Sequence, residues 1–176
     1  MLIVAAVVGR QIFNSRRTSN FNELATAAAC GELQVTETTG GMQHLAEGQT
    51  TRYDSSPPTH GAHAPNALPA GIYDEPFTNV LGERPTIYQA VHSLEHGYII
   101  VWHDGLTTEQ ERTLERRYRD ERKVIVVPYP QLRGGTQMAL TAWGRKVECE
   151  QPNTRVIDSF TDLFREARSA PEPKGA

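Results

Sequence analysis

The sequence predicts a single domain of the α+β class, with a small mixed β-sheet, flanking helices and one long ordered loop. The chain has 176 residues, of which 38% are hydrophobic, and this length suits one compact core. After residue 84, segments with helical spacing of apolar residues alternate with short β-branched runs, in the order helix, strand, helix, strand, strand, helix. Residues 40–84 sustain neither period and therefore form the loop.

The N-terminal part begins with a very apolar stretch, residues 2–8. This stretch fits three interpretations: the remnant of a membrane anchor, a short signal core, or a buried strand. Residues 20–30 are rich in Ala and Leu and stop before Gly31, so they predict a short helix, and residues 32–38 alternate like a short strand. We divide the chain into an N-terminal segment or anchor remnant (1–19), one domain (20–168) and a flexible tail (169–176).

The long loop has five Pro before position 77 and many Gly, Ser, Thr and Asn. A connection of more than 40 residues without secondary structure is rare in a compact domain. The loop is therefore either disordered or pinned by some additional contact.

The second half of the chain is regular. Pro85 suits the first turn of a helix and Gly97 its end, while Thr107 and Thr108 offer N-caps for a highly charged helix. We expect the second strand of this half to lie parallel to the first, joined by the charged helix, and the third to add antiparallel. The predicted elements are a helix over 85–96, strands over 98–102, 124–127 and 138–147, and helices over 109–123 and 154–168.

Composition excludes several functions. The 18 Lys and Arg against 21 Asp and Glu give a net charge of −3, so no basic field exists to attract nucleic acid. No apolar run reaches the roughly 18–20 residues of a membrane-spanning helix. The glycine-rich phosphate-binding motifs and the esterase G-x-S-x-G motif are also absent from the sequence. The sequence leaves the oligomeric state open.

The two cysteines, Cys30 and Cys149, are far apart and lack the C-x-x-C spacing of zinc knuckles and thioredoxin-like redox pairs. They form either one long-range disulfide or two buried free thiols. A bridge that closes so long a loop would stabilise the fold by a few kcal/mol and would indicate an oxidising compartment.

The histidines carry the chemical signal. His92 and His96 are four residues apart on the predicted helix, so both rings can reach one metal ion, and zinc and copper both suit imidazole. With Glu95 they form H-x-x-E-H, the inverted zincin motif, in which the carboxylate is a general base. Alternatively, the two histidines bind no metal and only close the helix, because protonated imidazoles are stabilised near its negative end. A second pair, His60 and His63, lies in the loop, where a metal would supply the missing constraint.

Five phrases in order carry a resemblance to a known family: YDSSPPTHGAH (53–63), GIYDEP (71–76), VHSLEHG (91–97), PYPQL (128–132) and ALTAWGR (139–145). The chain resembles the bacterial domain of unknown function DUF3105 over residues 40–168. The resemblance implies a membrane anchor at the N-terminus and a domain on the extracytoplasmic side, periplasmic or at the cell surface. It also implies His44, His63, His92 and His96 as the ligand set; at His60 this sequence departs from the family, so His60 is a doubtful ligand.

Three functions follow as expectations. The first is an extracytoplasmic domain that binds zinc or copper through His44, His63, His92 and His96, with Met42 or Met138 as an added thioether ligand if the ion is copper. The second is a zinc hydrolase in which Glu95 is the catalytic base. The third is an accessory subunit of a membrane protein complex that holds no metal, its histidines being hydrogen-bonded in the core.

Overall fold

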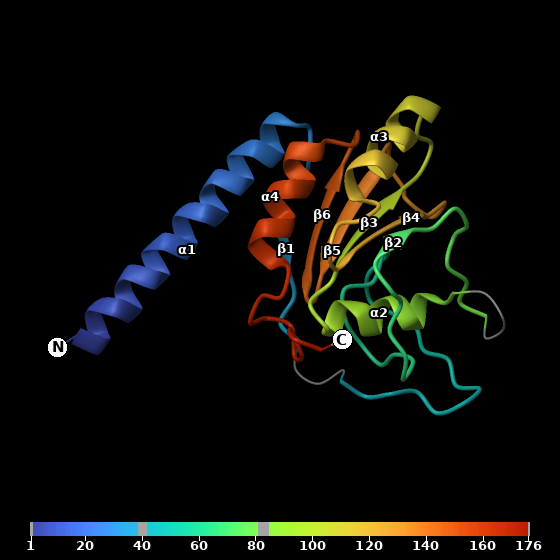
Figure 1. Ribbon diagram of the computed structural model, residues 1–176, viewed down its shortest axis with the longest axis horizontal. Coiled ribbons are helices and arrows are strands. Elements are labelled where there is room, and N and C mark those ends of the chain that lie inside the picture. The colour runs from blue at the N-terminus through green and yellow to red at the C-terminus, as the bar shows by residue number, and fades with distance from the viewer. Residues whose placement is uncertain (1, 39–41, 81–84, 176) are drawn as a thin grey trace.

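The computed structural model describes residues 2–38, 42–80 and 85–175, with side chains from residue 15 onward (Figure 1). Within these residues the predicted α+β class is confirmed, with four helices and a six-stranded mixed sheet. The helices are α1 (Leu2–Ala27), α2 (Ile87–Glu95), α3 (Thr108–Tyr118) and α4 (Thr154–Phe164). The strands are β1 (Gln34–Val35), β2 (Gly71–Ile72), β3 (Ile99–His103), β4 (Val124–Pro128), β5 (Met138–Ala142) and β6 (Arg145–Cys149).

The strand order is β1-β6-β5-β3-β4-β2. β4 runs parallel to β3, with Ile99 opposite Val124, as the sequence predicts for two strands joined by a helix. β2 adds in parallel to the outer side of β4, whereas β5, β6 and β1 continue the sheet antiparallel on the other side. The long loop thus contributes an edge strand, β2, that the sequence pattern does not reveal.

One strand prediction is wrong: residues 138–147 form a hairpin of two strands. Gly144, at φ +66°, closes the turn between β5 and β6. The buried Trp143 beside it reads in sequence as a continuation of the strand. Only glycine fits at this turn, because a Cβ on Gly144 would lie 2.8 Å from the carbonyl oxygen of Thr36.

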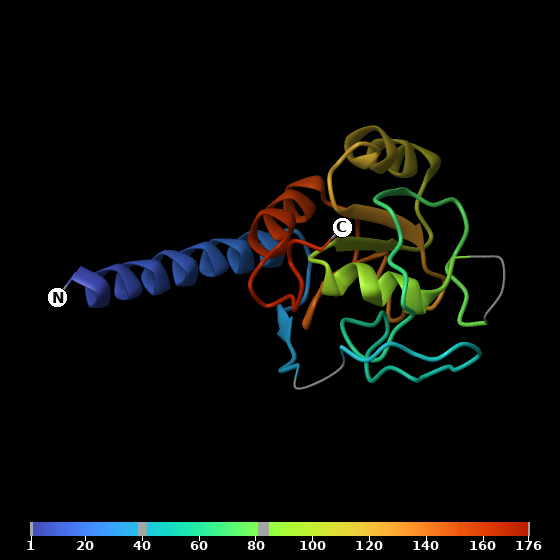
Figure 2. The ribbon, with the colours of Figure 1, turned by 60° about the horizontal axis from the view of Figure 1, so that its bottom comes forward.

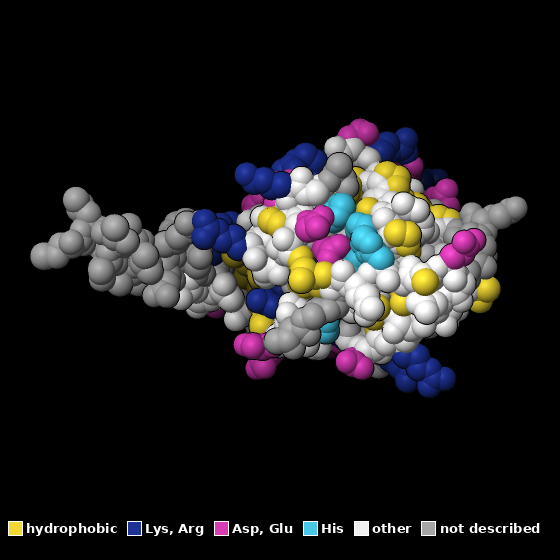
Figure 3. Space-filling model, turned by 90° about the horizontal axis from the view of Figure 1, so that it is seen from below, with side chains coloured by type: hydrophobic (Ala, Val, Ile, Leu, Met, Phe, Trp, Pro, Cys, Tyr) yellow, Lys and Arg dark blue, Asp and Glu magenta, His cyan; other side chains and the backbone are white. Residues whose placement is uncertain are grey.

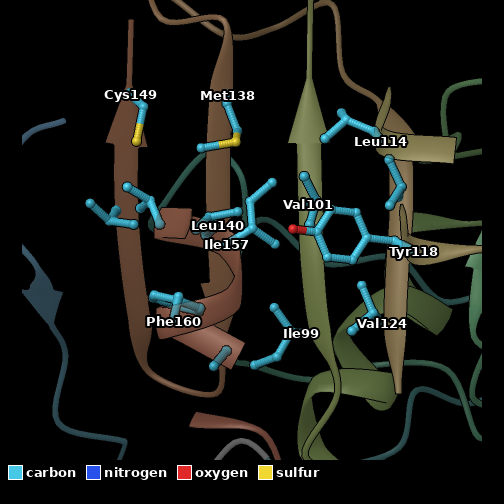
Figure 4. Packing of buried hydrophobic residues seen from close by; sticks show 14 of the residues in the cluster. Ile99, Val101, Leu114, Tyr118, Val124, Met138, Leu140, Cys149, Ile157 and Phe160 are labelled. Carbon is cyan, nitrogen blue, oxygen red and sulfur yellow. The ribbon is translucent and has the colours of Figure 1, made fainter. Parts of the chain in front are cut away.

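Alternate side chains of the central strands fill two cores on opposite faces of the sheet. On the first face, Ile99 and Val101 of β3 share a core with residues of α1, α3 and α4, among them Phe21. Figure 4 shows Tyr118 of α3 and Phe160 of α4 in this core. On the second face, Ile100 and Trp102 contact α2 and the long loop. Figure 2 shows α2 and the loop together on this second face.

Helix α1 extends further toward the N-terminus than the short helix predicted over 20–30. Residues 2–8 belong to it, so the buried-strand interpretation of that stretch is wrong. Its visible end projects away from the sheet, while its later turns lie beside α4 (Figure 1). Within the described part of the chain, no helix combines the length and hydropathy needed to cross a membrane.

Cys30 and Cys149 form a disulfide with an S–S distance of 2.00 Å across 119 residues, so the free-thiol interpretation is wrong. The backbone supports the same junction: the Gly31 N–H donates to the carbonyl of Glu148, and the Glu150 N–H donates to that of Ala29. The bridge fastens the end of α1 to strand β6.

Several element ends differ from prediction. α3 ends at Tyr118 and α4 at Phe164, each about a turn earlier than the polar, helix-favouring residues after them suggest. β1 covers two residues of the predicted 32–38. The described part of the predicted flexible tail (169–176) turns back to α2, where the Glu172 N–H donates to the Glu95 carbonyl (Figure 1).

Candidate metal centre

The long loop is fixed mainly by buried side chains. Leu68 and Phe77 enter the second core, and Pro57, Pro58 and Thr59 are buried as well. The Ser93 hydroxyl of α2 accepts a hydrogen bond from the Leu68 N–H at 2.8 Å. Ser93 therefore has a structural role, and the order of residues 53–77 does not require an ion. The predicted need for a metal applies at most to residues 42–50, which are exposed apart from the half-buried Leu45.

Helix α2 presents the chemical groups. Its N-terminus is set by a capping box, in which Thr86 accepts from the Gln89 N–H and the Gln89 side chain accepts from the Thr86 N–H. Its C-terminus is set by Gly97 at φ +77°. His92 and Glu95 lie one turn apart near this end, both nearly buried, and His96 is the C-cap residue.

Two loop histidines meet this end of α2. His44 and His63 form a β-bridge, in which the Leu45 N–H donates to the His63 carbonyl at 2.7 Å and the His63 N–H donates to the Gln43 carbonyl at 3.1 Å. The ring of His44 stacks on that of His92 with centroids 5.0 Å apart. Ligand atoms of His44, His63, His92 and Glu95 all lie within 4.8 Å of one another, so this group could hold a metal ion.

Imidazole nitrogens of the group lie close to the Glu95 carboxylate, and His92 also lies close to His96, which is outside the group. His63 Nε2 lies 3.1 Å from Glu95 Oε2, and His92 Nε2 lies 4.0 Å from the same oxygen. His92 Nε2 lies 3.0 Å from His96 Nε2. Two donor atoms bound to one tetrahedral zinc at about 2.0–2.1 Å each would be roughly 3.3–3.4 Å apart, so the distance between His63 and Glu95 needs little adjustment, whereas His92 would have to move closer to Glu95.

The other ring nitrogens define the protonation pattern. His63 Nδ1 lies 2.8 Å from the carbonyl of Gly61, and His92 Nδ1 lies 2.6 Å from that of Ala64. Because a carbonyl only accepts, each Nδ1 carries a proton, and each ring directs its Nε2 toward the group. His63 Nε2 and Glu95 Oε2 lie 3.1 Å apart, a contact that requires a proton or a cation between the two atoms.

Burial favours the neutral imidazole that a metal needs. Desolvation lowers the pKa of His92, with the hydrogen bond to Ala64 acting in the opposite direction. The rings of His63 and His92 are buried, whereas His44 is exposed, so the group is closed toward the core and open at one side. Figure 3 shows histidine side chains reaching the surface together, next to acidic ones.

A second group lies beside the first. Glu95, His96 and Glu172 also have ligand atoms within 4.8 Å of one another. His96 Nε2 lies 3.3 Å from Glu172 Oε2. Sequence reasoning missed Glu172, because it lies in the tail and no local pattern links it to α2.

The structure therefore brings His44, His63 and His92 together with Glu95, and places His96 next to His92 with Glu172. His60 stays outside this cluster: its Nδ1 pairs with the Thr59 hydroxyl. His103 lies at the end of β3 on the first face, and Met138 is buried in the first core, whereas Met42 is 61% exposed. Glu95, predicted as a catalytic base, lies among the candidate ligands.

Comparison with known proteins identifies a family and no close relative. A family model described as "Protein of unknown function (DUF3105)" matches residues 44–176. This match confirms the resemblance carried by the ordered motifs. No curated protein and no solved structure matches the chain.

Proposed function

Because the chain belongs to the DUF3105 family, whose description assigns no activity, we propose from its geometry that the domain binds a transition-metal ion, zinc or copper(II), on the extracytoplasmic side of a membrane. The observation that carries this proposal is the convergence of the Nε2 atoms of His63 and His92 on the Glu95 carboxylate. His44 completes the set from the exposed side.

The donor set indicates the kind of ion. Three imidazoles and one carboxylate suit zinc and copper(II), whereas copper(I) prefers thiolate or thioether ligands. Met138 is buried in the core and is unsuited to this site, which leaves Met42 as the nearest thioether in sequence to His44. The carbonyls of Gly61 and Ala64 hold the rings of His63 and His92 as outer partners hold metal-ligating histidines.

The cellular side rests on the disulfide. Cys30–Cys149 is of a kind that persists in oxidising compartments and is rare in the cytosol. We propose that the N-terminal helix connects the domain to a membrane or to a membrane protein complex.

Two other functions are alternatives to metal binding alone. In a zinc hydrolase, Glu95 would have to act as a base on a metal-bound water. The contact of Glu95 with His63 instead favours Glu95 as a metal ligand. In an accessory subunit without metal, shared protons would fill the contacts between His63 and Glu95 and between His92 and His96. This last arrangement predicts that the protein takes up no ion.

The test is metal analysis of full-length protein purified without a histidine tag. We expect zinc or copper to remain bound through gel filtration. The variant His44→Ala should weaken binding by more than the roughly 10- to 100-fold lost with outer-shell partners, because it removes a direct ligand. His60→Ala, which removes a loop imidazole outside the cluster, is the matched control and should bind normally. Folded protein that takes up neither ion when titrated with it would refute the proposal.

A further inference from the structure

Glu95 is the one residue common to the two groups of candidate ligands. Glu95 is nearly buried at 3% exposure, its carboxylate contacts His63 and His92, and it also has a ligand atom within 4.8 Å of His96. A carboxylate has two oxygens and can bind one metal through each. In two-metal sites the ions lie roughly 3.5–4 Å apart.

We infer that the cluster binds two divalent ions bridged by Glu95, an inference that rests on the proposed metal binding. The inner ion takes His44, His63 and His92 as its other ligands. The outer ion takes His96 and Glu172.

One ion cannot use all six side chains. Zinc in proteins is almost always four-coordinate, and two donors at about 2.1 Å from one ion are at most about 4.2 Å apart. Within each group of four or three residues, the ligand atoms lie within 4.8 Å of one another, and the described residues form two such groups instead of one. The six candidate ligands are therefore accounted for by two metal positions that share the Glu95 carboxylate.

The C-terminal segment is built to deliver Glu172. Its backbone N–H donates to the Glu95 carbonyl at 3.1 Å. The nearly buried Lys123 ammonium donates to the carbonyls of His96, Pro173 and Gly175, which ties the segment to the end of α2.

Glycine at position 175 is also part of this arrangement. A Cβ there would lie 2.7–2.8 Å from atoms of the His96 ring, so the segment packs directly against the imidazole. The outer position is therefore constructed from a helix end and a segment folded onto it.

The two positions should differ in affinity. The outer ion has three protein donors, one of them the shared Glu95, and the Glu172 side chain is 64% exposed. Its remaining coordination positions are filled by water or by a small anionic ligand. We expect the inner ion to bind first and the outer ion to be the exchangeable one.

The test is stoichiometry, measured with zinc alone on full-length untagged protein stripped by a chelator. Calorimetric titration and metal analysis after equilibrium dialysis should give two zinc ions per chain, the second weaker than the first. Glu172→Gln should reduce this to one ion with the affinity of the tighter step unchanged. Glu150→Gln, which alters another exposed acid, is the matched control and should still bind two.

A second variant tests the packing without removing a donor. Gly175→Ala should weaken the outer ion by at least several-fold, because the added methyl group displaces the segment from His96. Circular dichroism checks that both variants fold. One zinc per chain in the natural protein, unchanged by Glu172→Gln, overturns the two-ion inference and leaves the proposed function standing. No bound zinc or copper at all overturns both.

Discussion

Metal removal should loosen one short part of the loop and leave the rest in place. Residues 42–50 are exposed apart from the half-buried Leu45, and their backbone is joined to the rest of the described chain through the two hydrogen bonds of the His44–His63 bridge. His44 is their ligand to the candidate ion. In contrast, the Leu68 N–H donates to Ser93 and the Ala64 N–H donates to Tyr88, within a packed core.

The expected magnitude follows from binding linkage. At a free zinc concentration of 100 times Kd, an ion that binds only the folded state adds about 2.7 kcal/mol to the free energy of unfolding. For a chain of this size, 1 kcal/mol corresponds to roughly 2–4 °C, so a chelator should lower Tm by roughly 5–11 °C. The Leu45 and His63 amides should also lose most of their protection.

Hydrogen exchange with and without chelator measures the local effect, and calorimetry measures Tm. The Leu68 and Ala64 amides are internal controls that should stay protected. His60→Ala should reproduce the natural response, whereas His44→Ala should exchange at the Leu45 amide even with zinc present. Equal Tm and equal protection in both conditions would refute the reasoning, because an ion that joins loop to helix cannot leave without either effect.

Three further predictions concern stability and are measured by urea denaturation. Replacing both Cys30 and Cys149 by Ala should cost about 4–5 kcal/mol, since the bridge spans 119 residues; a loss below about 1 kcal/mol would contradict the loop-closure argument. Burial lowers the pKa of His103, against opposing effects of Glu111 and Asp104, so the unfolded chain binds its proton first and stability should fall as pH drops below about 6.5; His103→Asn should flatten this slope, and an unchanged slope would count against it. The Thr161 hydroxyl is buried without a hydrogen-bond partner among the described residues, so Thr161→Val should stabilise the fold by about 1 kcal/mol whereas Thr161→Ser should not.

The sequence predicts helices and strands best where the hydrophobic periodicity and the residues that mark the ends of an element agree. α2, β3 and β4 are found within one or two residues because Pro85, Gly97 and the β-branched runs mark their ends. The sequence-based prediction fails where a contact with a distant segment determines the local structure. The β5–β6 turn at Gly144 is set by the approach of Thr36, the residue after β1, and the edge strand β2 forms because β4 offers it partners.

The candidate site is predictable to a similar degree. The helical spacing of His92 and His96 and the resemblance to the family pointed to residues that the fold does bring together. The contribution of Glu95 as a candidate ligand depends on where the loop places His63, which spacing along the chain does not encode. Glu172 depends on the return of the tail to α2, where Lys123, the residue before β4, holds the tail.

The attachment of α1 has a mechanical consequence. Among its described side chains, those of Phe21 and Ala25 are buried, and just beyond its end Cys30 is covalently bonded to β6. At about 1.5 Å per residue, its 26 residues form a rod about 39 Å long. Because this rod is firmly joined to the domain at one end, a displacement of its far end would turn the domain and would change the direction in which the histidine cluster faces. A pull along the rod would reach the sheet through a covalent joint rather than through packing alone.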